Sequence, residues 1–400
     1  MLDGVNVALG VTGSIAAVKT VELAHELRRR GANVRAVMTE SAQGIVHPWS
    51  VEFATENDVV TEITGRVEHV ELCGRDEWAD VLLVAPATAN TVGKMAHAVD
   101  DTPVSTCATT ALGSGLPVVV APAMHEPMYD HPGVLESIER LESWGVSFVD
   151  PRIEEGKAKI ATEDAIALAV SRATGDSPLS GRHVVVTSGA TVESVDPVRV
   201  LTNRSSGRTG RAVARACYAL GADVTLVHGA VGPHALTTGE AVEGVPYADL
   251  VAVESAEEMT DATLDAVADG DDPADALVSV AAISDYTVDR ADEKIRSGQD
   301  ELSISLEPTR KLIDAVRASD PDLRIVGFKT ETSGDDESMV DAARETLSRV
   351  GLAFVVANDA SVMGSAESRA LLVHETAYSE FEGTKERLGL EVARALAATL

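Results

Sequence analysis

The sequence has 400 residues with 64 acidic and 33 basic side chains, a formal net charge of −31 that excludes a general nucleic-acid-binding surface. The length predicts two or three domains, because a single domain usually spans about 100–200 residues. No apolar run approaches the ~20 residues of a membrane span, and the N-terminus lacks a basic region before its apolar segment, so we expect no membrane span, no signal peptide and a cytoplasmic location.

The first predicted unit covers residues 6–39 and reads strand, small-residue loop, helix, glycine, strand. Apolar side chains recur at intervals of three along its helix: Ile15, Val18, Val21, Ala24 and Leu27. This spacing predicts one apolar stripe that faces a sheet. Gly31 stands where the end of a helix needs a left-handed residue, and Gly221 repeats this in a similar unit that starts near residue 182.

Further buried strands are expected where the sequence is almost continuously apolar, as in parallel sheets covered on both faces. These segments are 81–88, 117–124, 276–284, 324–331 and 353–359. The polar stretch 171–182 is the best linker candidate. We therefore expect an α/β protein with two doubly wound, Rossmann-like domains, at residues 1–175 and 182–400.

Several loops of the first domain carry residues suited to a ligand at the carboxyl ends of the strands. In "GVTGSIAAVK", Gly13 and Ser14 stand at a helix N-terminus, where free amides and hydroxyls can bind a phosphate. Taken alone, that loop is equally well explained as a tight turn. Other loops of this kind are "MTESA", "APATANTVGKMA", "DDTPVSTCATT" and "APAMHEPMYDHP".

Together these loops resemble the flavin-dependent cysteine decarboxylases, which use FMN to decarboxylate a cysteinyl group. The resemblance implies a flavodoxin-like FMN domain in which His69 of "VEHVELC" is catalytic. Without the family, a histidine before such a strand-like alternation is more often structural. The implied cofactor-binding residues are Gly13, Ser14, Ile15, Thr39, Ala87, Thr88, Asn90, Ser105 and Thr106.

The implied chemistry needs an electron sink, because a cysteine carboxylate does not lose CO2 readily. Oxidation of the thiol-bearing carbon by the flavin provides a thioaldehyde β to the carboxylate, and the electrons are returned afterwards. His69 is the group expected to handle protons near neutral pH.

The first domain departs from this family at two places. His125, with Met128 close by, replaces an asparagine that contacts the substrate carboxylate; a histidine can donate a hydrogen bond there and, when charged, can pair with the carboxylate. The stretch "EEGKAKIAT" lacks the flap cysteine that acts as the last proton donor. Lys157 or Lys159 is a candidate for that role, and the alternative is that both are exposed flap charges.

The stretch "VTSGATVESVDPVRVLTNRSSGRTG", residues 186–210, resembles the phosphopantothenate–cysteine ligases almost residue for residue. Fusion of this domain after a decarboxylase is the arrangement of the bifunctional coenzyme A biosynthesis proteins, and the resemblance covers nearly the whole chain. It implies that Asn203 contacts an acyl-nucleotide intermediate. Phosphopantothenate and cysteine would be joined with CTP or ATP, and the product phosphopantothenoylcysteine would be the substrate of the decarboxylase.

The ligase substrates are anionic, so the site needs donors, cations and a divalent metal, Mg2+ or Mn2+. The implied substrate-binding residues are Ser206, Gly207, Gly210, Ser279, Val280, Ala281, Asp285, Lys294, Phe328, Asn358 and Asp359. Asp285 can accept a hydrogen bond from the exocyclic amine of cytosine, which favours CTP. Thr346 and Val350 stand where relatives often carry lysines that contact the triphosphate, so the choice between CTP and ATP stays open. The resemblance also implies a homo-oligomer, with trimers assembled into a dodecamer.

Two rival functions are less well supported. A flavin prenyltransferase-like domain fused to an NAD(P)-dependent reductase is disfavoured, because no GxGxxG follows the strand at 183–188 and no Tyr-x-x-x-Lys pair accompanies it. A non-catalytic flavin-binding subunit is supported only by His125 and the missing flap cysteine.

The acidic residues are spread along the whole chain, and arginine outnumbers lysine. This pattern favours adaptation to high salt, where screening weakens the repulsion between carboxylates. The alternative is an ordinary acidic enzyme.

Overall fold

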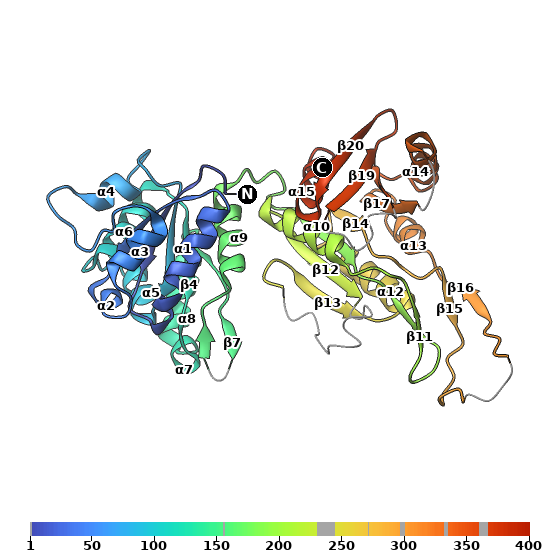
Figure 1. Cartoon of the computed structure of the whole chain (residues 1–400), viewed down its shortest axis with the longest axis horizontal. Coiled ribbons are helices and arrows are strands. Elements are labelled where there is room, and N and C mark those ends of the chain that lie inside the picture. The colour runs from blue at the N-terminus through green and yellow to red at the C-terminus, as the bar shows by residue number, and fades with distance from the viewer. Residues whose placement is uncertain are drawn as a thin grey trace. The chain divides into compact units, whose positions relative to one another are not determined.

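The computed structural model describes residues 2–154, 157–229, 245–270, 272–296, 301–331, 335–359 and 367–400. The chain divides into two compact units, Met1–Asp176 and Ser177–Leu400, which are described separately (Figure 1). Helix α9 runs from Glu163 to Thr174, so the start of the expected linker is helical. In the part of the chain that the structure describes, no helix has the length and apolar character needed to cross a bilayer.

Unit 1 contains a five-stranded parallel sheet in the order β2-β1-β3-β4-β6. Its strands are β1 (Asn6–Val11), β2 (Asn33–Met38), β3 (Val81–Ala87), β4 (Val118–Pro122) and β6 (Ser147–Phe148). This is the flavodoxin-like order, in which the strand sequence reverses between β1 and β3. A ligand in such a fold binds at that reversal, outside the carboxyl ends of the strands.

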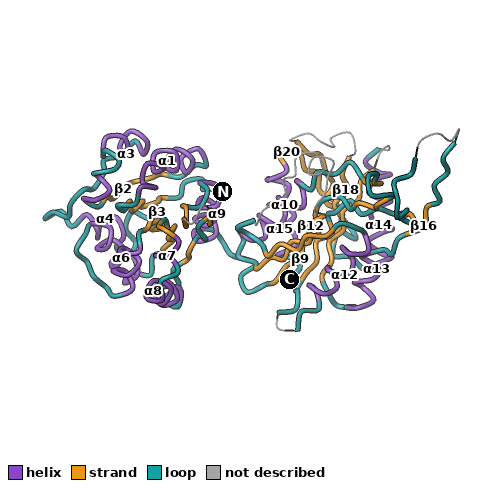
Figure 2. Tube along the Cα trace, turned by 90° about the horizontal axis from the view of Figure 1, so that it is seen from below, coloured by secondary structure: helices purple, strands orange, loops and turns teal. Residues whose placement is uncertain are grey.

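Helices cover both faces of this sheet (Figure 2). One face carries α1 (Thr20–Arg29), α3 (Pro48–Thr55) and α9. The other carries α4 (Glu68–Cys73), α5 (Ala89–Ala96), α6 (Pro103–Ser114) and α8 (Pro132–Glu142). The short helices are the 3-10 helix η1 (Ile15–Lys19), α2 (Glu40–Gln43) and α7 (Glu126–Tyr129).

The apolar stripe predicted for the first helix is wrong at its N-terminal end. Ile15 and Val18 are 78% and 55% exposed, and Ala17 is the buried residue of that turn. The turn is a 3-10 helix with about three residues per turn, so its rows of side chains do not continue the face that α1 presents to the sheet. Further along, Ala24 and Leu27 are buried as predicted.

Unit 2 contains an eight-stranded sheet in the order β13-β12-β9-β14-β17-β18-β19-β20. The bounds are β9 (His183–Ser188), β12 (Asp223–Gly229), β13 (Asp249–Val253), β14 (Ala276–Ser279), β17 (Arg324–Glu331), β18 (Phe354–Asp359), β19 (Glu367–Val373) and β20 (Tyr378–Thr384). The first six strands are parallel in Rossmann-like order, and β19 and β20 add antiparallel to them. The expected fold class, two doubly wound α/β domains, is thus confirmed.

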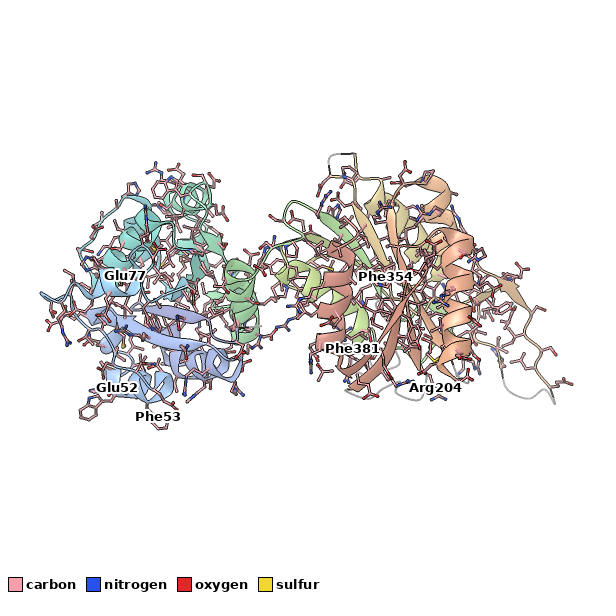
Figure 3. All side chains as sticks on the ribbon, turned by 90° about the horizontal axis from the view of Figure 1, so that it is seen from above. Glu52, Phe53, Glu77, Arg204, Phe354 and Phe381 are labelled. Atoms are coloured by element: carbon pink, nitrogen blue, oxygen red, sulfur yellow. The ribbon has the colours of Figure 1, made fainter. Side chains whose placement is uncertain are left out.

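The helices of unit 2 also form layers on the sheet. One group, α12 (Ala256–Val267), α13 (Leu312–Ser319) and α14 (Asp336–Val350), shares a core with β9, β14, β17 and β18. Another helix pair, α10 (Arg208–Ala219) and α15 (Lys385–Ala397), packs closely, since a Cβ at Gly389 would lie 2.5 Å from the carbonyl oxygen of Ala212. Phe354 is a fully buried side chain of this unit (Figure 3).

Two antiparallel ribbons extend from the main sheet of unit 2 (Figure 1). One pairs β10 (Val192–Ser194) with β11 (Val200–Thr202), and the other pairs β15 (Tyr286–Val288) with β16 (Leu306–Pro308). The strand expected at 276–284 is shorter than predicted, because β14 ends at Ser279 and the chain continues as a loop at the carboxyl edge.

Both helix-ending glycines have the expected backbone. Gly31 has φ +98° and Gly221 has φ +102°, in the left-handed region that other residues rarely adopt.

Candidate functional site

In unit 1, three loops meet at the reversal point of the sheet. The Thr12 hydroxyl donates to the carbonyl of Pro86 at 2.7 Å and accepts from the Thr88 amide at 3.2 Å. The Ser14 hydroxyl donates to the carbonyl of Ala123 at 3.0 Å. These bonds join the carboxyl ends of β1, β3 and β4 and fix the loop that the sequence predicts to hold a phosphate.

Gly13 is required by a close approach of two loops. A Cβ at this position would lie 2.3 Å from Oγ and 2.6 Å from Cβ of Ser41, distances that real structures do not tolerate. The Ser41 hydroxyl lies 3.1 Å from the hydroxyl of Thr39, another predicted cofactor residue. The loops after β1 and β2 therefore form one surface with Gly13 at its centre.

Several predicted cofactor-binding hydroxyls are used by the helices themselves. Thr88 caps α5, and Thr102 and Ser105 form a capping box at the start of α6. The Thr106 hydroxyl donates to the Thr102 carbonyl at 2.9 Å. These side chains define the helix N-termini, whose first amides have no partner within the helix. Asn90 is exposed on the first turn of α5, whereas Ala87 is buried in β3.

His69 lies on helix α4 and not on a strand, so the strand-like interpretation of "VEHVELC" is wrong. Leu72 and Cys73, three and four residues later, are fully buried and hold this helix against the core. The His69 ring is half-buried, and its Nδ1 is buried without a hydrogen-bond partner among the described residues. Because buried polar atoms are nearly always paired, this nitrogen is available for a ligand or a proton.

A three-stranded antiparallel sheet brings His125 and the flap together. Strand β8 (Lys157–Lys159) lies between β5 (Met124–His125) and β7 (Arg152–Glu154). His125 pairs with Lys157, whereas Lys159 pairs with Arg152. His125 and Lys157 are both exposed, and Met128 on α7 is 49% exposed. The structure thus places Lys157, and not Lys159, directly beside His125.

In unit 2, the loop at 203–207 returns in space to the end of β9, although a whole ribbon separates them in the sequence. A Cβ at Gly210 would lie 2.5 Å from Oγ of Ser188, and the Ser188 hydroxyl donates to the carbonyl of Gly207 at 2.8 Å. Gly207 has φ +69°, and a Cβ there would lie 2.9 Å from the Cα of Gly189. The loop therefore lies where a phosphate-binding loop directly after β9 would lie, and its Ser206 is exposed.

Asn203 connects this loop to the loop after β14. Its side-chain amide donates to the carbonyl of Ala282 at 3.0 Å, and the Ala282 amide donates to the carbonyl of Gly189 at 3.0 Å. Asn203 is exposed, so the face of its amide group that is not bonded to Ala282 can reach a substrate.

Two buried threonines that the sequence did not single out organise the loop after β14. The Thr187 hydroxyl accepts from the amides of Val280 at 3.1 Å and Ala281 at 3.3 Å. The Thr191 hydroxyl accepts from the Ser284 amide at 2.8 Å. The only sequence signal is their place at the end of an apolar strand. The backbone amides of two predicted substrate-binding residues, Val280 and Ala281, are thus bonded within the protein.

Asp285 is predicted to contact the nucleotide base, and in the structure it forms an ion pair with Lys311. Both side chains are more than half exposed, at 72% for Asp285 and 56% for Lys311. An exocyclic amine that binds Asp285 would therefore compete with the Lys311 ammonium.

Asn358 and Phe328 lie on neighbouring strands, β18 and β17. The Oδ1 atom of Asn358 is buried and has no partner among the described residues, and the Phe328 ring is half-buried. The two residues are two register positions apart on adjacent strands. An unpaired buried acceptor and an aromatic ring in this arrangement suit a ligand that carries an N–H donor and a flat face. The side chain of Asp359 lies outside the described residues.

Lys294 lies in a segment that Asp196 and Arg199 hold through the backbone of Ile295. The Ile295 amide donates to the Asp196 carboxylate at 3.1 Å, and the Arg199 guanidinium donates to the Ile295 carbonyl at 3.0 Å. Lys294 is exposed, and no contact among the described residues brings it to the loop of Asn203. The sequence did not single out Asp196, although an aspartate before proline is a common start of a turn.

Asp196 is a buried carboxylate, 2% exposed, and three backbone amides donate to it. Burial raises its pKa, but the hydrogen bonds from Val198, Ile295 and Arg199 outweigh burial and lower the pKa to about 2. The carboxylate is therefore ionised at all ordinary pH values.

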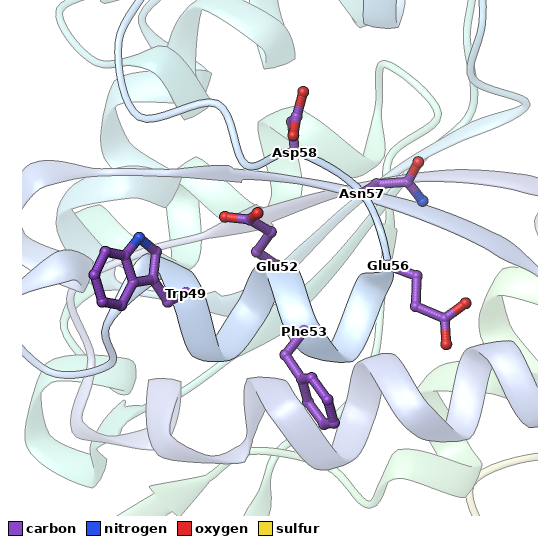
Figure 4. Close-up of a pocket in the computed structure, with 6 residues that line it drawn as sticks. All are labelled: Trp49, Glu52, Phe53, Glu56, Asn57 and Asp58. Carbon is purple, nitrogen blue, oxygen red and sulfur yellow. The ribbon is translucent and has the colours of Figure 1, made fainter.

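Within the described ranges, no group of three or more histidine, cysteine, aspartate or glutamate side chains is placed to hold a metal ion. A separate hollow of about 650 Å³ lies beside α3 and is lined by Trp49, Glu52, Phe53, Glu56, Asn57 and Asp58 (Figure 4). Among the residues that the structure describes, no predicted site residue lines it.

Two family models cover almost the whole chain. A model described as flavoprotein matches residues 1–175, and a model described as the C-terminal domain of DNA/pantothenate metabolism flavoproteins matches residues 179–400. The coenzyme A biosynthesis bifunctional protein CoaBC of Thermococcus kodakarensis is 47% identical over 374 residues, with 93% of this chain and 89% of that protein covered. The chain belongs to the bifunctional coenzyme A biosynthesis family.

A second member of this bifunctional coenzyme A biosynthesis family has a lower identity to this chain. The protein of the same name from Methanocaldococcus jannaschii is 33% identical, with 90% of this chain and 85% of that protein covered. Among solved structures, an FMN-dependent cysteine decarboxylase named SpaF is 31% identical over 44% of this chain and 100% of its own, at a TM-score of 0.39.

Family membership confirms the resemblance that the sequence motifs indicated, because both halves match in the expected order. Unit 1 is a flavoprotein domain and unit 2 is the ligase domain of this family. The rival fusion of a prenyltransferase-like domain with a reductase is thereby excluded.

Proposed function

We propose that the chain catalyses two consecutive steps of coenzyme A biosynthesis. The ligase domain joins 4′-phosphopantothenate to cysteine, and the flavoprotein domain decarboxylates the resulting phosphopantothenoylcysteine to 4′-phosphopantetheine. One observation carries this proposal: the glycine loop 203–210 folds onto the end of β9, and its Asn203 bonds to the loop after β14. The other half of the same chain is a flavoprotein domain.

For the decarboxylase we propose FMN as the flavin, held where the loops after β1, β3 and β4 meet. At Gly13 the backbone lies so close to Ser41 that no side chain fits, and Nδ1 of His69 is buried without a partner. We propose that a bound group lies at these two places. When bound, the flavin supplies the two-electron oxidation and reduction that decarboxylation requires. His69 holds or moves a proton at its ring nitrogen, and His125 binds the substrate carboxylate.

For the final protonation we propose Lys157, because its strand position is opposite His125. Residues directly opposite in an antiparallel pair have Cβ atoms about 4.5–5.5 Å apart. A donor at this distance from the carboxylate-binding residue can reach the carbon that loses CO2. Lys159 lies opposite a different residue, Arg152.

For the ligase we propose that Asn203 holds an acyl oxygen of the activated pantothenate. The bond from its amide to Ala282 fixes the side chain before the substrate arrives, which lowers the entropic cost of holding the reacting group. The carboxylate of phosphopantothenate attacks the α-phosphorus of the nucleotide and releases pyrophosphate. The amine of cysteine then attacks the acyl carbon of the acyl-nucleotide, forms the amide with loss of a proton, and releases the nucleoside monophosphate.

We propose CTP as the nucleotide, with Mg2+ bound to its phosphates. The buried acceptor of Asn358 and the ring of Phe328 support a base at the ends of β17 and β18. Mg2+ neutralises phosphate charge in such reactions, and a chain of net charge −31 has particular need of it.

A homo-oligomer, with trimers assembled into a dodecamer, is also proposed. Four large apolar side chains near η1 and α3 are more than half exposed in the single chain: Ile15, Val18, Trp49 and Phe53. Exposed apolar surface of this kind favours association. Sedimentation of the purified protein measures the assembly directly.

The decisive experiment supplies the protein with phosphopantothenate, cysteine, Mg2+ and either CTP or ATP, and identifies products by mass. Formation of pyrophosphate and CO2 together with 4′-phosphopantetheine supports both steps. Pyrophosphate without CO2 retains the ligase and rejects the decarboxylase, and the absence of both products rejects the proposal. The nucleotide that supports the faster ligation is then identified as the substrate.

A further inference from the structure

His228 lies at the carboxyl edge of the unit 2 sheet, on the side of the glycine loop 203–210. It is 4% exposed and is the last residue but one of β12, in register with Ser188 of β9. Register partners on neighbouring parallel strands point to the same face of a sheet. Because the Ser188 hydroxyl bonds the carbonyl of Gly207, the His228 ring also lies on the face that carries the glycine loop.

The His228 ring lies directly against Gly207. A Cβ at Gly207 would lie 2.8 Å from Cε1 of His228, the ring carbon between the two nitrogens. Gly207 is also the N-cap of the 12-residue helix α10, and it makes no side-chain hydrogen bond there. The first amides of this helix have no partner within the helix, so the imidazole edge adjoins a loop with free backbone donors.

The two ring nitrogens of His228 have different surroundings. The Arg211 guanidinium donates to Nε2 at 3.5 Å. Nδ1 is buried and has no hydrogen-bond partner among the described residues. Burial, with a further contribution from Arg211, lowers the pKa of His228 to about 4, so the ring is neutral near pH 7.

The position of the single ring proton follows from Arg211. A guanidinium donates hydrogen bonds and accepts none, so the Nε2 atom that faces it is the acceptor. The proton of the neutral ring is therefore on Nδ1. Buried N–H groups are nearly always paired, and an unpaired N–H beside a phosphate-binding loop suits an oxygen atom of the ligand.

His183 shows how the same sheet uses a histidine that is purely structural. It lies at the start of β9, at the opposite edge of the sheet, and is 8% exposed. Its Nδ1 lies 2.8 Å from the carbonyl oxygen of Asp272, and its Nε2 lies 2.9 Å from the hydroxyl of Thr225. Both nitrogens of His183 are thus used within the protein, whereas His228 keeps one nitrogen at the edge where ligands of such folds bind.

We propose that His228 is a further ligand-binding residue of the ligase site, and that its Nδ1–H donates a hydrogen bond to a phosphate oxygen held by the glycine loop. The inference rests on the proposed ligase function, because that function supplies the phosphate. A donor to a charged oxygen forms a short, strong hydrogen bond. The oxygen belongs either to the nucleotide or to phosphopantothenate, and the test separates these two sources.

Two substitutions separate the roles of the two ring nitrogens. The side-chain amide of asparagine places a donor close to the position of Nδ1 of histidine, and that of glutamine reaches the position of Nε2. His228→Asn should therefore keep the bond to phosphate and lose the bond from Arg211, and His228→Gln should do the reverse. Calorimetric titration of the full-length protein with CTP and Mg2+, and separately with 4′-phosphopantothenate, measures both affinities.

His228→Gln is expected to weaken the binding of at least one ligand about tenfold or more, because a hydrogen bond to a charged group is lost. His228→Asn should stay within about threefold of the unmodified protein, because it retains that bond. The ligand with the larger loss carries the phosphate that His228 contacts. His183→Gln is the matched control: losing the bond to Asp272 should lower its melting temperature and leave both affinities unchanged.

Three results would overturn the inference and leave the ligase function standing. Equal affinities in the unmodified protein and in His228→Gln show that His228 does not contact the ligand. An equal loss in both His228 variants shows a structural role, and a loss in His228→Asn alone shows that His228 holds Arg211. If the unmodified protein binds neither ligand, the inference and the proposed function fail together.

A second measurement tests the ring proton in the unmodified protein. Solid-state nitrogen NMR of the full chain with isotope-labelled histidine distinguishes protonated from unprotonated ring nitrogens, and the signal missing from His228→Asn is that of His228. We expect a neutral ring at pH 7 with its proton on Nδ1, and a shift of the Nδ1 signal when CTP or 4′-phosphopantothenate binds. A proton on Nε2, or no shift with either ligand, would overturn the inference.

Discussion

His125 on β5 lies directly opposite Lys157 on β8 in the flap sheet. One of these residues replaces the usual carboxylate-binding asparagine, and the other lies in the stretch that lacks the usual flap cysteine. Because they are cross-strand neighbours, the two departures occur in one place and form a single altered corner of the site. In the proposed mechanism, the small sheet that presents His125 to the carboxylate also holds the proposed proton donor, Lys157, beside it.

The first prediction concerns this corner. Lys157→Met is expected to lower the decarboxylation rate roughly 100-fold, since general acid catalysis contributes about 10²–10⁴-fold, and to leave ligation unchanged. Lys159→Met is the matched control, because Lys159 is in the same strand but pairs with Arg152. CO2 release and ligation are measured separately. An equal loss of decarboxylation in both variants would contradict the assignment of Lys157 as the proton donor.

Gly13 gives a prediction about flavin binding. Gly13→Ala forces a Cβ to within 2.3 Å of Oγ of Ser41, so the loops after β1 and β2 must separate. We expect the purified variant to hold much less flavin, measured as visible absorbance per protein. Ser41→Gly in the same chain removes the two closest atoms and leaves a contact at 3.2 Å, so the double variant should recover most of the flavin. No recovery would show that the clash is not the cause.

Gly93→Ala is the control for that experiment. Gly93 lies in α5, and a Cβ at this position would meet no other side chain of the described residues within 4 Å. Alanine favours a helix by up to about 1 kcal/mol over glycine, so this variant should keep its flavin and melt at the same or a slightly higher temperature.

Asn203 gives a prediction about the ligase. Asn203→Asp replaces the amide donor that bonds Ala282 with an acceptor, and the two oxygens then repel each other. The acyl-nucleotide should still form but be held poorly for attack by cysteine, so it accumulates. Rapid quenching and mass analysis detect it. Ligation at the unmodified rate would contradict the role of Asn203.

Individual residues show how much of the fold and of the candidate site the sequence predicts. The motif around Asn203 predicts the ligase through its resemblance to a known ligase family. The contact of Gly210 with Ser188 depends on a chain reversal through β10 and β11, which no local pattern encodes. Ile15 shows the opposite failure, since its spacing matches a buried stripe but a 3-10 turn leaves it 78% exposed. Local periodicity predicts elements, and tertiary contacts decide which side chains meet.

Asp196 gives a prediction about pH. Its folded pKa, about 2, lies below the usual 3.8, so its contribution to stability is fully present above pH ~4 and is lost as the pH falls toward 2. Asp196→Asn should therefore lower the melting temperature at pH 7, and the difference from the unmodified protein should shrink between pH 4 and pH 2. Asp292→Asn, an exposed residue of the segment that Asp196 anchors, should show no such difference. A pH-independent difference would contradict the assignment.

The last prediction concerns salt. At a net charge of −31, the many carboxylates of the protein repel one another. Salt screens this repulsion, because the Debye length falls from about 10 Å at 0.1 M salt to about 3 Å at 1 M. Salt also weakens the exposed ion pairs, such as Lys19 with Glu22, but each of these is worth only about 0–1 kcal/mol. Relief of the repulsion should outweigh that loss, so the melting temperature should rise steadily from low to molar KCl. A flat or falling curve would mean that the acidic surface does not reflect adaptation to high salt.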